Sequence, residues 1–119
     1  MIPGWRRSEL ISLAFHREVA KRLRADPDGV LKKARGNLAK MRSVHGRSSE
    51  PYFSVWEKLL DGPMDELMHV LLTDDQESFD LRQCTPFAGI VPEKRRQDIL
   101  KRLFDEIRQD RVGDEAPRA

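Results

Sequence analysis

Hydrophobic residues recur along most of this chain at the spacing of an amphipathic helix. Ile11, Phe15, Val19 and Leu23 are spaced four residues apart, which puts them on one helical face. Similar stripes predict helices at about 8–25, 27–45, 52–60, 64–72 and 92–111, and a short one ending at 83. No segment shows the strict alternation of a strand. We therefore predict an all-α fold, a compact bundle of about five to six helices.

The turn between the first two predicted helices is the clearest boundary. Asp26 can cap a helix whose first residue is Pro27, and Ser8 and Thr73 or Asp74 are candidate caps elsewhere. Gly46 is a candidate left-handed terminus for the second helix. Because both helices are long and the turn is short, we predict an antiparallel helical hairpin at the N-terminus.

The first helix has apolar residues on a second side, where Leu10, Leu13 and Ala14 lie. Such a helix needs cover on two faces, from an additional helix or from a second subunit. A homodimer therefore stays open as an alternative.

A length of 119 residues fits one domain, and we expect it to span 1–112 with a flexible polar tail at 113–119. The single cysteine, Cys84, excludes an internal disulfide and favours a reducing compartment. The first residues lack the long uncharged apolar run of a secretory signal or membrane span. We expect a cytoplasmic protein that does not enter a membrane.

Motifs for catalysis and cofactor binding are missing from the sequence. It contains no GxxxxGK[ST], GxGxxG, HExxH or CxxC. His16, His45 and His69 fall on three different predicted helices, whereas zinc ligands normally come in closely spaced pairs. Cys84 has no neighbouring histidine and is interpreted as a buried, inert thiol. We expect a protein that is not an enzyme and has no catalytic residue, metal or cofactor.

Charge is distributed unevenly behind the net value of +2. Residues 1–47 carry twelve Lys/Arg against four Asp/Glu, whereas residues 48–91 carry two against nine. A basic segment of this kind can follow a phosphate backbone, or it can pair with the acidic middle of the same chain. The candidate nucleic-acid-binding residues are Arg17, Lys21, Arg24, Lys33 and Lys40.

The segment 81–91 is unusual because it is apolar and also rich in Pro and Gly. Such a loop is costly to expose to water, so it either covers the core or contacts a partner. Phe87 is suited to fill a pocket, and Arg82 can hydrogen-bond loop carbonyls or a partner carboxylate. The candidate partner-binding residues are Arg82, Gln83, Pro86 and Phe87.

Several strings together resemble small helical bacterial antitoxins. These strings are SELISLAFHREVA at 8–20, Asp26-Pro27 followed by Val30-Leu31 and Asn37-Leu38, WEKLLDGP at 56–63, and LRQ at 81–83 with PFAG at 86–89. They are similar to the MenA-like partners of nucleotidyltransferase toxins, and to the C-terminal module of some helix–turn–helix regulators. The resemblance spans about residues 8–100 and consists of packing and turn motifs.

This resemblance implies an antitoxin that neutralises, by direct protein–protein binding, a cognate toxin encoded by a neighbouring gene. A nucleic-acid-binding transcriptional regulator that uses the basic N-terminal helices is the alternative. An enzyme that modifies its partner is a third hypothesis, for which the sequence offers neither a nucleophile nor a polar cleft.

Overall fold

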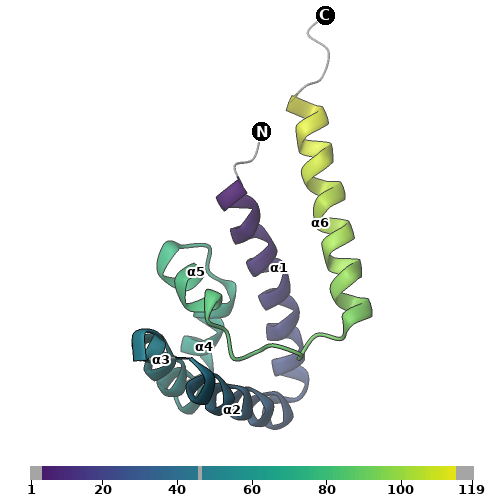
Figure 1. Ribbon diagram of the computed structural model, residues 1–119. Coiled ribbons are helices and arrows are strands. Elements are labelled where there is room, and N and C mark those ends of the chain that lie inside the picture. Colours follow the sequence, from purple (N-terminus) through teal and green to yellow (C-terminus); the bar gives the residue numbers. More distant parts are fainter. Residues whose placement is uncertain (1–3, 46, 115–119) are drawn as a thin grey trace, which may run out of the picture.

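The computed structural model describes residues 4–45 and 47–114, and this part of the chain is helical with no strand. Six α-helices follow one another, and a short 3-10 turn at Arg47–Ser49 precedes the third (Figure 1). They are α1 (Gly4–Ala25), α2 (Pro27–Val44), α3 (Glu50–Asp61), α4 (Met64–Leu72), α5 (Gln76–Gln83) and α6 (Glu93–Asp114). The predicted all-α class is confirmed.

The core lies where α1 to α5 meet, around the indole of Trp56 on α3. Trp56 is fully buried, and the core cluster to which it belongs contains residues from every helix except α6. The C-terminal half of α1 contributes Val19, Ala20 and Leu23 to this core, and α2 contributes Val30, Ala34 and Leu38. Burial of these side chains is the main source of stability for a fold without disulfides.

The first two helices form a corner rather than the antiparallel hairpin expected from the sequence. Figure 1 shows α2 running across the lower end of α1. Asp26 is the only residue between the two helices, and its carboxylate accepts a hydrogen bond from the Gly29 amide at 3.1 Å. This predicted cap is confirmed, with Pro27 in the first helical position. A single linking residue is too short to turn α2 back alongside α1.

Three predicted boundaries differ in detail from the structure. Ser8 does not cap α1, because the helix begins one turn earlier and the Ser8 hydroxyl donates to the Gly4 carbonyl at 3.3 Å. Asp75, rather than Thr73 or Asp74, caps α5 by accepting from the Ser78 amide at 2.7 Å. Gly46 lies outside the described residues. Of the predicted tail 113–119, residues 113–114 continue α6 and the others also lie outside the described residues.

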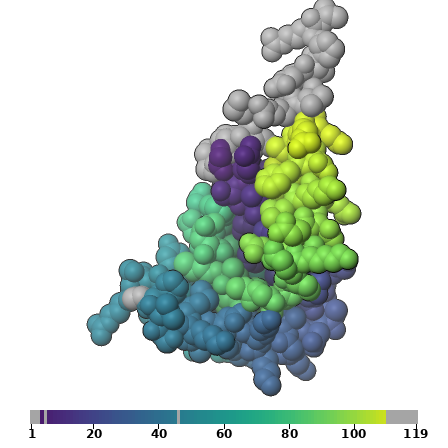
Figure 2. All heavy atoms as spheres, turned by 45° about the vertical axis from the view of Figure 1, so that its right-hand side comes forward, coloured from purple at the N-terminus to yellow at the C-terminus, as the bar shows by residue number. Residues whose placement is uncertain are grey.

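The last helix is peripheral and packs on α1. The two helices run antiparallel to each other (Figure 1), and they stand side by side above the base made by α2 and α3 (Figure 2). No side chain between Glu93 and Gln109 is fully buried, and Phe104 is 40% exposed. Thus α6 supplies part of the second cover that α1 was expected to need. Among the described residues, no helix combines the length and apolar character required to cross a membrane.

Candidate functional site

The apolar loop that follows α5 belongs to the protein core. Pro86 and Phe87 are buried, and the Phe87 ring meets Trp56 edge-on with centroids 5.8 Å apart. The Trp56 indole donates to the carbonyl of Leu81 at 2.9 Å, which ties the end of α5 to the same cluster. This segment therefore covers the core in the isolated chain.

Side chains of α2 fix the path of this loop. The Asn37 amide donates to the carbonyls of Pro86 and Ala88 at 2.8 and 2.9 Å, and the Lys33 ammonium donates to the Gly89 carbonyl at 2.9 Å. Gly89 has φ of +76°, a left-handed conformation that favours glycine. Three hydrogen bonds from α2 therefore fasten the loop to a distant part of the chain.

Replacing Asn37 with Ala is expected to lower the free energy of unfolding by about 2 kcal/mol, because two loop carbonyls lose their donor at once. Lys33→Met removes one hydrogen bond from an exposed position and should cost less than about 1 kcal/mol. Urea denaturation of both variants measures the difference. Equal losses would show that Asn37 does not organise the loop.

A buried polar network joins α1, α4, α5 and this loop. The Arg82 guanidinium, which is 3% exposed, donates to the carbonyls of Val70 and Thr73 at 2.8 and 2.9 Å. It therefore satisfies carbonyls at the C-terminal end of α4. Its Nε donates to the Ser12 hydroxyl at 2.9 Å, which links α5 to α1.

The imidazole of His16 continues this network toward the loop. Its Nδ1 lies 2.7 Å from the Ser12 carbonyl, and its Nε2 lies 2.9 Å from the Thr85 hydroxyl. Since a carbonyl only accepts, Nδ1 carries the proton and Nε2 accepts from Thr85. The Thr85 oxygen accepts in turn from the Phe87 amide at 3.2 Å.

Burial shifts the pKa of both titratable side chains in the network. It lowers the pKa of His16 to about 4, and the nearby Arg82 cation adds to this shift. It also lowers the pKa of Arg82 from its usual value. The buried, neutral imidazole in this position is a structural element of the network.

The candidate partner-binding residues are therefore largely inaccessible in the isolated chain. Arg82, Pro86 and Phe87 are buried, and only Gln83 of the four is exposed. The sequence singled out the right segment as unusual. Its apolar residues are explained by the core-covering interpretation.

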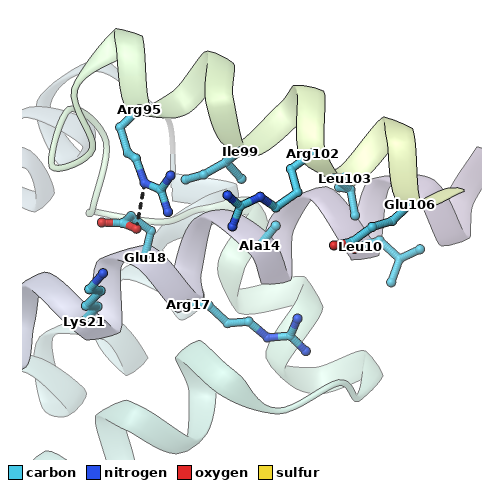
Figure 3. A pocket seen from close by; sticks show the side chains of 10 residues that line it. All are labelled: Leu10, Ala14, Arg17, Glu18, Lys21, Arg95, Ile99, Arg102, Leu103 and Glu106. Carbon is cyan, nitrogen blue, oxygen red and sulfur yellow. Dashed lines mark hydrogen bonds and ion pairs between the residues drawn. The ribbon is translucent and has the colours of Figure 1, made fainter.

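A second feature, which the sequence analysis did not identify, is a groove of about 440 Å³ between α1 and α6 (Figure 3). Each helix supplies five lining residues at the same spacing of i, i+4, i+7, i+8 and i+11. This spacing keeps five side chains on one helical face. The lining residues are Leu10, Ala14, Arg17, Glu18 and Lys21 from α1, and Arg95, Ile99, Arg102, Leu103 and Glu106 from α6.

The groove changes in character from one end to the other. Figure 3 shows Lys21, Arg95 and Glu18 at one end, and Leu10, Leu103 and Glu106 at the other. Glu18 is nearly buried and accepts from Arg95 at 3.1 Å and from Arg22 at 3.0 Å, so it joins α6 to α1. The Arg96 guanidinium on α6 lies 5.2 Å from the centre of the Phe15 ring on α1. This cation–π contact is a second link between the two helices.

Positive charge dominates the groove, with four basic and two acidic side chains. Among the described residues, Arg17, Lys21 and Arg102 take part in no ion pair. All three are exposed. Unpaired cations beside a half-buried apolar floor form a surface that can bind an anionic, amphipathic partner.

The structure separates the candidate nucleic-acid-binding residues into several places. Arg17 and Lys21 line the groove. Lys33 is engaged with the Gly89 carbonyl, and Lys40 lies farther along α2 without lining the groove. Arg24 is exposed in the last turn of α1. Of the five side chains, only Arg17 and Lys21 line the groove.

The remaining reactive residue types have ordinary surroundings. His69 lies 3.2 Å from the Thr73 hydroxyl, and the exposed His45 ring tilts against Phe53. Cys84 is a free, half-buried thiol packed against the core, so it is less buried than expected. No cluster of three or more potential metal ligands occurs among the described residues.

Comparisons with known proteins add no assignment, since no family model, curated protein or solved structure matches this chain.

Proposed function

We propose that this protein is a non-catalytic binding protein whose α1–α6 groove captures a segment of a partner protein. The observation that carries the proposal is the composition of the groove, in which Leu10, Ala14, Ile99 and Leu103 provide an apolar floor beneath unpaired cations. Apolar contact area supplies affinity at such surfaces, and charges at the rim select the partner and speed its approach.

An antitoxin is the kind of binding protein that we favour, because of the sequence resemblance described above. An antitoxin of this type forms a stoichiometric complex with its toxin and occludes it. The pre-folded helical core supports this proposal, because a binding surface on rigid helices loses little conformational entropy when the complex forms. The toxin encoded by a neighbouring gene is the proposed partner.

The groove is tested by two adjacent charge reversals on α6. Arg102 lines the groove, whereas Lys101 is exposed and does not line it. In co-expression with the neighbouring gene product, the wild-type chain and Lys101→Glu should co-purify with the partner and protect growth. Arg102→Glu should weaken the complex at least about tenfold, equivalent to about 1.4 kcal/mol.

Two outcomes would contradict the proposal. If the wild-type chain neither co-purifies with that product nor changes its toxicity, the antitoxin role is wrong. If Arg102→Glu and Lys101→Glu weaken the complex equally, the groove is not the contact surface. Circular dichroism melts of both variants show whether each retains the helical fold.

Nucleic-acid binding remains the second candidate, because Arg17 and Lys21 are exposed and free of ion pairs within the described residues. The apolar floor beneath them argues against it, since a phosphate backbone gains nothing from Leu10 or Leu103. Binding to DNA would weaken steeply with salt, with a slope set by the number of phosphates neutralised. A mobility shift that disappears in Arg17→Glu and Lys21→Glu would favour this alternative.

A further inference from the structure

The two helices that border the groove display the side-chain spacing of a bundle from which one helix is missing. Their lining residues repeat at i, i+4, i+7, i+8 and i+11 on both sides. Two helix faces with this repeat can pack against another helix, whose side chains fit as knobs between the side chains of α1 and α6.

Exposure along both helices agrees with an incomplete bundle. Leu10, Ala14, Ile99 and Leu103 are all only half-buried in the isolated chain. They form the middle and one end of the groove, as Figure 3 shows. A further helix laid over these residues would remove their remaining apolar surface from water.

The charges of the groove define the chemistry of this additional helix. Arg17, Lys21 and Arg102 have no ion-pair partner among the described residues, whereas Arg95 is already engaged by Glu18. Lys21 and Arg102, together with Arg17, which also lies near the Asp74 carboxylate, favour carboxylates at the facing positions. At the other end, Leu10 and Leu103 favour Leu-like residues, and the neighbouring Glu106 carboxylate favours a neutral or basic residue opposite it.

From these observations we infer that the groove binds an acidic amphipathic α-helix of the partner protein, which packs on α1 and α6 as the third helix of a bundle. The apolar residues of this helix lie over Leu10, Ala14, Ile99 and Leu103. Its carboxylates face Arg17, Lys21 and Arg102. The inference rests on the proposed function and adds to it the form and charge of the bound segment.

Designed peptides test the inference directly on the full chain. The probe is a helical peptide of about 20 residues with Leu at i, i+3, i+4 and i+7 over one half and Glu at the same positions over the other. Two control peptides have Gln in place of those Glu residues, or the same composition scrambled so that the helical face is lost. Fluorescence anisotropy gives the dissociation constants.

We expect the acidic peptide to bind at least tenfold more tightly than either control. The double variant Arg17→Glu/Lys21→Glu should weaken this peptide at least tenfold and should bind a peptide with Lys at the Glu positions instead. Lys32→Glu/Lys101→Glu changes the net charge by the same amount outside the groove, at exposed positions, and should leave binding within about twofold.

Other results overturn the inference and identify another occupant. Equal binding of all three peptides, or of none, excludes an acidic helix in the groove. A homodimer that dissociates in the Arg17→Glu/Lys21→Glu variant assigns the groove to a second copy of this chain, and duplex DNA that displaces the peptide assigns it to nucleic acid. If no peptide binds while the co-purified partner still requires Arg102, the inference is wrong and the proposed function stands.

Discussion

Phe87→Ala is expected to destabilise the whole domain by about 3–5 kcal/mol, the usual cost of deleting a buried aromatic ring. The Phe87 side chain is 3% exposed and packs edge-on against Trp56, so its removal leaves a cavity at the centre of the core. Single domains have a total stability of about 5–15 kcal/mol. The melting midpoint should fall on the order of 10–20 °C.

Gln83→Ala is the matched control for this experiment, since Gln83 is exposed in the same segment and its truncation should change stability by less than about 0.5 kcal/mol. Thermal and urea denaturation of both variants measure the effect. A Phe87→Ala chain that melts like the wild type but no longer holds its partner would contradict the placement of this ring in the core. It would restore the partner-contact interpretation of the loop.

The helices were predictable because apolar periodicity is a local property of the sequence. The Asp26-Pro27 cap was likewise encoded by adjacent residues, and the structure confirms it. The angle between α1 and α2 was not predictable from the same residues. It depends on how Val19, Ala20 and Leu23 pack against α2 and α3, which are contacts between distant parts of the chain.

The burial of several polar side chains could not be predicted from the sequence. Arg82, His16 and Glu18 are all nearly buried, although charged and polar residues are normally assigned to the surface. Arg82 and Glu18 are stabilised by partners from other helices, Ser12 and Arg95, and His16 is stabilised by Thr85 of the loop that follows α5. Such pairings become visible only when the helices are assembled.

The groove, too, could not be predicted from the sequence, because it depends on contacts between distant parts of the chain. The equal spacing of its lining residues is present in the sequence on both helices. What the sequence does not contain is the fact that α6 packs against α1, about 80 residues away along the chain. Arg17 and Lys21 were therefore identified as a basic face, but their companions Arg102 and Leu103 were not.

Acidification should destabilise the protein through His16, by about 3 kcal/mol between pH 6.5 and pH 4. In the folded chain the pKa of His16 is lowered to about 4, whereas in the unfolded chain the imidazole has its ordinary value of 6.5. Between these two values the unfolded state binds more protons than the folded state. The free energy of unfolding therefore falls as the pH falls through this window, by up to about 1.4 kcal/mol per pH unit.

Comparison of two histidine variants isolates this contribution from the carboxylates, which also titrate on the acidic side. His16→Gln removes the buried imidazole, so its unfolding free energy should change less than that of the wild type between pH 6.5 and pH 4. His45→Gln removes an exposed imidazole and should keep the wild-type dependence. Urea denaturation at several pH values measures both, and an NMR titration of the His16 ring gives its pKa directly.

A His16 that titrates near pH 6.5 in the folded chain would show that the imidazole reaches solvent. The hydrogen bonds to Ser12 and Thr85 would then not hold α1 against the loop.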